Sequence, residues 1–119
     1  MDEFIIEQVN LTIKRGDTTT YILYLEDEDG KNKDITGWTI FFTVKSNIDD
    51  ADDDAVIKKT ITTHTNPTNG ETQIFITSTD SANVGNYVYD IQYKDTVGNI
   101  KTIMEGYFAI TKDVTQRES

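Results

Sequence analysis

The chain has 119 residues and a formal net charge of -10, with 21 acidic and 11 basic residues. This acidic balance disfavours nucleic acid and anionic membranes as partners, and no apolar run approaches the ~20 residues of a membrane-spanning helix. The absence of cysteine excludes a disulfide framework and thiolate chemistry. The length is typical of one domain, which we expect to occupy residues 1–119.

The first segments predict a loose arm and then a strand. Residues 1–7 lack the basic and long apolar regions of a signal peptide, although residues 4–6 form a short apolar run that could dock on a neighbour. Apolar residues alternate over 9–14, which predicts a strand. The triplet Arg15-Gly16-Asp17 matches an integrin-type adhesion sequence, but Gly-Asp is ordinary turn chemistry, so we interpret it as a turn.

Two strands are predicted at 18–25 and 38–45, separated by a tight turn at Asp29-Gly30. The positions expected to face the core are Tyr21, Leu23, Leu25, Trp38, Ile40, Phe42 and Val44. Phe41 falls on the opposite face, where solvent is expected. It is either covered by a loop or marks a contact surface.

The acidic stretch 46–54 raises the question of calcium, a cation that takes several oxygen ligands. Asp50, Asp52 and Asp54 match the opening of an EF-hand loop. The pattern then fails, because Ala55 stands where the loop needs glycine and Ile61 where it needs glutamate. We interpret the stretch as a solvated loop with no metal, and these three aspartates are its only metal candidates.

The middle of the chain predicts two further strands, 55–63 and 71–77, joined as a hairpin through Asn69-Gly70. Lys58 and Lys59 are expected to point outward, as on an edge strand. His64 is the only histidine, has no catalytic partner in the sequence, and is interpreted as polar surface. Residues 78–84 predict a short helical crossover.

The last two strands are predicted at 85–93 and 100–111, around a turn at 95–99. The first has strict alternation and should be central, with Tyr87, Tyr89, Ile91 and Tyr93 on its core face. In the second, Met104, Phe108 and Ile110 should face inward, and Gly106 predicts a close approach or a bulge. The polar tail 112–119 is expected to fray or to lead into a further segment of a longer protein.

These elements predict an all-β fold, an immunoglobulin-like antiparallel β-sandwich of about seven strands. Trp38 begins the third main strand, where such folds bury a tryptophan. Tyr87 lies two residues before the inward position Tyr89, which matches a tyrosine corner with Tyr89 at the place of the second cysteine. An up-and-down barrel is the alternative.

No residue set in the sequence supports catalysis or a cofactor site. There is no pairing of nucleophile and base, no metal-ligand spacing and no phosphate-binding glycine loop. We therefore expect a protein that is not an enzyme and has no cofactor.

An ordered set of motifs resembles a phage family. The motifs are Arg15-Gly16-Asp17-Thr18, Asp29-Gly30, Asp34-Ile35-Thr36-Gly37, Gly85-Asn86-Tyr87-Val88-Tyr89-Asp90, Gly98, Lys101-Thr102, Gly106-Tyr107-Phe108-Ala109-Ile110 and Asp113-Val114-Thr115. In this order they resemble the N-terminal domain of baseplate upper proteins and related small tail proteins from phages of Gram-positive bacteria. The acidic loop 49–54 is not part of the resemblance.

The resemblance implies a structural role in the virion, for a protein made in the bacterial host cytoplasm. The domain would be an adaptor that attaches tail or receptor-binding components through protein–protein contacts, and homo-oligomerisation is one option. Phe41, Ile103 and Tyr107 are the apolar residues expected to be exposed for these contacts. The alternative is an adhesin-type binding module that recognises a cell-surface glycan or protein through its end loops.

Overall fold

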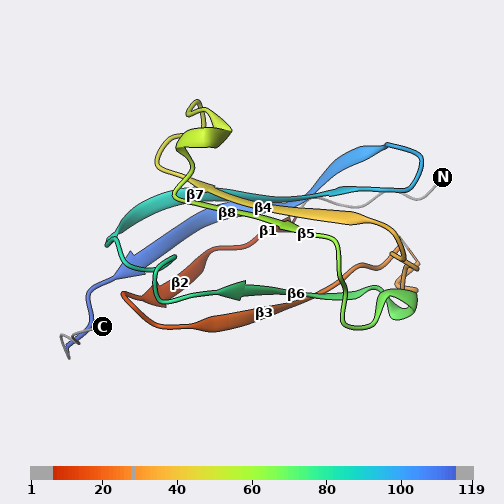
Figure 1. The fold of residues 1–119 in the computed structure, drawn as a ribbon, viewed down its shortest axis with the longest axis horizontal. Helices are drawn as coiled ribbons and strands as arrows, with labels where there is room; N and C mark the ends of the chain where they lie inside the picture. The colour runs from red at the N-terminus through yellow and green to blue at the C-terminus, as the bar shows by residue number, and fades with distance from the viewer. Residues whose placement is uncertain (1–6, 28, 115–119) are drawn as a thin grey trace.

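The computed structural model describes residues 7–27 and 29–114, and in these residues the strands form a larger and a smaller sheet, one above the other (Figure 1). The larger, six-stranded sheet contains β1 (Glu7–Gln8), β2 (Leu11–Lys14), β4 (Thr39–Lys45), β5 (Ile57–Ile61), β7 (Gly85–Lys94) and β8 (Ile100–Thr111). The smaller sheet contains β3 (Thr19–Tyr24) and β6 (Glu71–Ile76). Two short 3-10 helices, η1 (Asp52–Asp54) and η2 (Pro67–Asn69), lie in the connections.

Strand β7 is the middle of the larger sheet, whose order is β1-β8-β7-β4-β5, with β2 also on β8. The predicted inward face is confirmed, because Tyr87, Tyr89, Ile91 and Tyr93 are all buried. The intervening residues of β7 face the other side of the sheet. The same strand therefore supports both the core and the outer face.

The core lies between the two sheets and is centred on three aromatic rings. Phe42 lies 5.7 Å from Tyr89 and 6.0 Å from Phe108 between ring centroids. Both phenylalanines are fully buried. The smaller sheet contributes Ile74 and Ile76, which are also fully buried. These inward residues agree with the period-2 prediction for β4, β6 and β8.

The sheet is mixed, so the prediction of a purely antiparallel sandwich is wrong. Strands β1 and β2 run parallel to β8. Among the described strands, β3 and β6 of the smaller sheet pair with each other alone. Strands β1 and β2 thus lie on the side of β8 that is opposite to β7. The alternation of apolar residues in these segments does not specify β8 as their partner.

The predicted hairpin between the fourth and fifth strands is also wrong. Strand β5 pairs with β4 in the larger sheet, while β6 pairs with β3 in the smaller one. Lys59 alternates with outward Lys58 and so points toward the small-sheet side. There its ammonium group lies 2.6 Å from the Asp80 carboxylate. Burial raises the pKa of Asp80, but hydrogen bonds with Lys59 and Thr77 outweigh it and hold that pKa below its usual value.

The predicted helical crossover at 78–84 is a set of turns with no helix. The Thr77 N–H donates to the Asp80 carboxylate, and the Asp80 N–H donates to the Thr77 hydroxyl oxygen. Ser81 is fully buried and donates its hydroxyl to the carbonyl of Asp17. These reciprocal side-chain bonds satisfy the backbone locally, which removes the need for a helix.

Ile103 is 7% exposed, so the expectation that it is an exposed contact residue is wrong. The pairing of β7 with β8 shifts between Ile91 and Gln92, whose partners are Met104 and Thr102. Ile103 is the extra residue at this bulge. A bulge reverses the alternation of faces, and it turns Ile103 into the core.

An ion pair joins the end of β2 to the segment that follows β8. Arg15 follows β2, and its guanidinium group makes two contacts with the Asp113 carboxylate, at 2.8 and 3.0 Å. Asp113 lies in the segment predicted to fray, but its side chain is only 10% exposed. The Arg-Gly-Asp triplet is thus a turn, as predicted, with its arginine in an ion pair. Residues 1–6 of the predicted arm and residues 115–119 of the predicted tail lie outside the described residues, and Glu7 belongs to β1.

Candidate functional site

The outer face of the six-stranded sheet carries a hollow of about 740 Å³. In Figure 1 the β4–β5 connection with η1 and the β7–β8 hairpin both rise on this side, away from β3 and β6. Ile48 from that connection and Ile100 at the start of β8 line the hollow. We call this hollow the outer groove.

The floor of the outer groove consists of three rows of side chains across the strands. The strand register places Thr60, Phe41 and Gln92 in the first row, Lys58, Thr43, Asp90 and Glu105 in the second, and Lys45, Val88 and Tyr107 in the third. The middle row is polar, and each flanking row contains an aromatic ring. Phe41 is half-buried and Tyr107 is 66% exposed. These two predicted contact residues therefore line the same groove.

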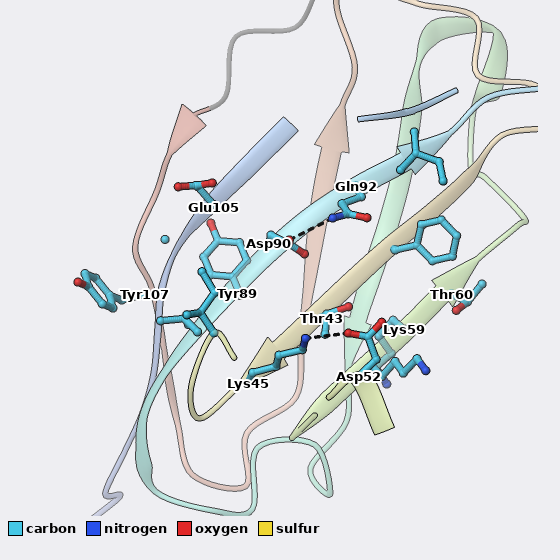
Figure 2. Close-up of a pocket in the computed structure, with 16 residues that line it drawn as sticks. Thr43, Lys45, Asp52, Lys59, Thr60, Tyr89, Asp90, Gln92, Glu105 and Tyr107 are labelled. Atoms are coloured by element: carbon cyan, nitrogen blue, oxygen red, sulfur yellow. Dashed lines mark hydrogen bonds and ion pairs between the residues drawn. The ribbon is translucent and has the colours of Figure 1, made fainter. Parts of the chain in front are cut away.

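Asp90 and Glu105 are directly opposite each other on β7 and β8, which places two carboxylates on the groove floor (Figure 2). Burial raises the pKa of the Asp90 carboxyl above its usual value, and the charges of Asp52 and Glu105 add to this effect. A 3.3 Å hydrogen bond from Gln92 and the charge of Lys45 act in the opposite direction. The floor thus holds negative charge in a partly desolvated place, which favours a cationic group in a ligand.

Replacing Asp90 with asparagine should raise the melting temperature at neutral pH. The folded-state pKa of Asp90 lies above the unfolded value, so its ionised form destabilises the native protein, and this penalty disappears as the pH falls through the folded pKa. The advantage of Asp90→Asn should therefore shrink at about pH 4. Asp34→Asn is the control of opposite sign, since hydrogen bonds from the Thr36 hydroxyl and N–H lower the pKa of Asp34. Thermal melts at both pH values test this; a lower melting temperature for Asp90→Asn at neutral pH would contradict it.

The acidic loop forms one rim of the groove. Asp52 lies 2.7 Å from the Lys45 ammonium, the ion pair drawn in Figure 2. Asp50 accepts a hydrogen bond from the Asn47 N–H, and Asp53 lies 3.8 Å from Lys58. Within the described residues no three acidic, histidine or cysteine side chains are arranged to hold a metal ion. The structure therefore does not bring the metal candidates Asp50, Asp52 and Asp54 together as a ligand set.

The residues predicted to have structural roles lie on the core side of the same strands. Trp38 precedes β4, is half-buried, and stacks on Tyr93 with ring centroids 4.5 Å apart. The Tyr89 hydroxyl donates to the Val9 carbonyl at 2.6 Å, which ties β7 to the break between β1 and β2. The Tyr87 hydroxyl donates to the Asn83 carbonyl at 2.7 Å. The predicted bond from Tyr87 to upstream backbone is thus present.

Replacing Tyr87 with phenylalanine should lower the free energy of unfolding by about 1–2 kcal/mol, because one buried hydrogen bond is lost. The ring itself stays, and Tyr87 does not line the outer groove, so binding at the groove should be unaffected. Chemical denaturation measures the first effect. An unchanged midpoint would show that the bond to Asn83 does not stabilise the fold.

His64 was predicted to be polar surface, but it links β6 to the residue that precedes β4. Its Nε2 lies 2.7 Å from the Trp38 carbonyl oxygen, and its Nδ1 lies 2.8 Å from the Thr72 hydroxyl. A carbonyl oxygen only accepts, so Nε2 carries the proton. Thr72 belongs to β6 and is fully buried. The burial of Thr72 is the signal that could have indicated this contact. The sequence does not show that Thr72, among the polar residues of β6, is the one that is buried.

No helix in the described part of the chain has the length and apolar character that crossing a membrane requires. No protein-family model matches the sequence, and no curated protein matches it. The structure is similar to that of the N-terminal domain of phage TP901-1 ORF48, with a TM-score of 0.58 and 10% identity over 89% of each chain. At this identity the likeness shows a shared all-β fold.

Proposed function

We propose that the chain is a non-enzymatic structural protein of a phage tail or baseplate, an adaptor domain that attaches tail or receptor-binding components through protein–protein contacts. One observation carries the proposal: the fold is shared with a phage protein domain over 89% of both chains. The ordered motifs that resemble baseplate upper proteins support the same origin from the sequence.

Three of those motifs also have a structural meaning in this chain. The Arg-Gly-Asp-Thr motif supplies Arg15 and the Asp-Val-Thr motif supplies Asp113, and these two side chains form the ion pair at the ends of β2 and β8. The Gly-Asn-Tyr-Val-Tyr-Asp motif supplies Tyr87 and Tyr89, with their two hydroxyl-to-backbone bonds. The resemblance therefore rests on residues that build the fold.

We assign the domain to an immunoglobulin-like form. The order β8-β7-β4-β5 matches the G, F, C and C′ strands of a variable-type sheet, and β3 with β6 matches strands B and E. The bond from Tyr87 to Asn83 matches the tyrosine corner. In this form the core is buried between the two sheets, and the outer face of the larger sheet is available for contacts with other proteins.

The outer groove is the contact surface that we assign to the adaptor, and its occupant is a segment of another tail or baseplate protein. Phe41 and Tyr107 offer aromatic area, which proteins favour at interfaces. Asp90 and Glu105 between them favour a lysine or arginine side chain of that segment.

Immunogold labelling of purified phage particles tests the proposed place of the protein. Antibody against this chain should label the distal end of the tail. A second set of particles, complemented with Tyr107→Ala, should incorporate less of the protein, whereas Val97→Ala should be incorporated normally, because Val97 is 80% exposed and lies outside the groove. Particles that lack the protein altogether would refute a virion role, and equal incorporation of both variants would refute the groove as the contact surface.

A further inference from the structure

Strand β3 has an open edge. Within the described residues it pairs with β6 alone. The Leu25 N–H donates to the Gly70 carbonyl, and the same register places Tyr21 opposite Ile74 and Leu23 opposite Thr72. In an antiparallel pair the backbone groups face the partner at every second residue. The N–H and carbonyl groups of Thr20, Ile22 and Tyr24 therefore point away from β6, and Figure 1 shows β3 at the lower margin of the molecule.

The residues with outward backbone groups also carry exposed side chains. Ile22 is 54% exposed and Tyr24 is 58% exposed. Phe75 on β6 lies directly opposite Thr20 and is 53% exposed. Together, Ile22, Tyr24 and Phe75 form an apolar strip on the outer face of the smaller sheet, next to an unpaired backbone edge.

Strand β3 lacks the features that usually protect an edge. Natural edge strands carry lysine, proline, bulges or short lengths that prevent pairing with another chain. The β5 edge of this molecule has Lys58 and Lys59. By contrast β3 has six residues, a continuous register and no charged residue, glycine or proline. Of the eight described strands it is the only one without a charged residue.

We propose that β3 is a self-association surface, where two copies of this chain pair antiparallel and join their smaller sheets into one four-stranded sheet. Because β3 has no charged residue, a second copy is repelled least at this edge. Two molecules with a net charge of -10 each repel over most of their surfaces, and β3 offers an uncharged line of approach. An antiparallel edge is also self-complementary about a two-fold axis, as a closed dimer requires.

The two-fold axis passes through Ile22. Ile22 of one copy then lies opposite Ile22 of the other, and Thr20 lies opposite Tyr24, so all three outward-facing residues fall in hydrogen-bonded pairs. Across the joined sheet the rows bring Phe75 and Thr20 of one copy beside Tyr24 of the other. The two apolar strips thus merge on one face. The inference does not depend on the proposed phage function.

Sedimentation velocity over a range of concentrations tests the dimer. The wild-type chain should pass from monomer to dimer, and added salt should strengthen the dimer because it screens the like charges. Ile22→Lys should weaken dimerisation by about tenfold or more, since lysine is a common protector of edges. Val97→Lys is the matched control, with the same charge change at an 80% exposed residue far from β3 in sequence, and should dimerise as the wild type does. Thermal melts of both variants check that each is folded.

Cysteine cross-linking tests the register, and the chain has no cysteine of its own. Across a hydrogen-bonded antiparallel pair the two Cα atoms lie about 5.5 Å apart, which a disulfide can span. Ile22→Cys should therefore form a covalent dimer under mild oxidation, and Phe75→Cys should not. A chain that stays monomeric at every concentration, a dimer that Ile22→Lys leaves intact, or a cross-link at Phe75 in place of Ile22 would each overturn the proposal.

Discussion

Replacing Gly106 with alanine should lower the free energy of unfolding by about 3–5 kcal/mol. A Cβ atom at this position would lie 2.1 Å from the Val9 carbonyl oxygen and 2.8 Å from the Val9 carbonyl carbon. Both are backbone atoms, so neither can rotate out of the way. The backbone at Val9 must then move away from β8.

This movement would disrupt several contacts at once. The Val9 N–H donates to the Glu105 carbonyl, and the Val9 carbonyl accepts from the Tyr89 hydroxyl. The Asn10 side chain accepts a hydrogen bond from the Tyr107 N–H at the same place. The variant therefore loses packing and hydrogen bonds between the N-terminal strands and the centre of the sheet.

Gly30→Ala is the control for a glycine substitution without overlap. Gly30 has a φ of +79° but no atom within 4 Å of the position of a Cβ. It should cost about 1–2 kcal/mol through backbone strain alone. Chemical denaturation of both variants gives the comparison, and a loss for Gly106→Ala no greater than that for Gly30→Ala would contradict the account of the Val9 contact.

Replacing Phe108 with alanine should cost about 3–5 kcal/mol, through lost burial and the cavity that remains. Phe108 is fully buried and packs edge-on against both Phe42 and Tyr89. The adjacent Tyr107 points to the other face and is 66% exposed. Tyr107→Ala should therefore change stability by less than about 0.5 kcal/mol.

The pair of variants separates the two faces of β8. Phe108→Ala should shift the denaturation midpoint strongly, and Tyr107→Ala should leave it almost unchanged while reducing attachment to other tail proteins. If Tyr107→Ala proved as destabilising as Phe108→Ala, the exposed orientation of Tyr107 would be wrong.

The residue pattern predicted local strands well because period-2 alternation reports which face of a strand is buried. The inward faces of β3, β4 and β7 agree with their sequences, as does the turn at Asp95–Asn99, where the Asp95 N–H donates to the Asn99 carbonyl. Gly106 was also predicted to allow a close approach, and Val9 is what approaches.

Strand partners could not be predicted in the same way, because a sequence of alternating residues carries no label for its neighbour. The parallel pairing of β2 with β8 and the separation of β5 from β6 depend on contacts far apart in sequence. Ile103 illustrates a smaller version of the same problem. One bulge reverses its face, and no local residue marks the bulge.

The outer groove was only partly predictable. Phe41 and Tyr107 were identified as apolar residues on the solvent side, but the strand register brings them around the same hollow as Asp90 and Glu105. His64 was missed because its partners are far apart in sequence: Trp38 directly precedes β4 of the larger sheet, and Thr72 belongs to β6 of the smaller one. Single side chains can be selected from a sequence, whereas their assembly into a site depends on the tertiary fold.

Deletion of the gene for this chain from the phage genome, followed by quantitative mass spectrometry of the purified particles, tests the adaptor role most directly. The account predicts that the particles lose this protein together with at least one other tail or receptor-binding protein, and that wild-type protein supplied in trans restores both. Particles that keep every other tail protein at its normal amount, and lose only attachment to the host cell, would contradict the adaptor role and indicate an adhesin instead.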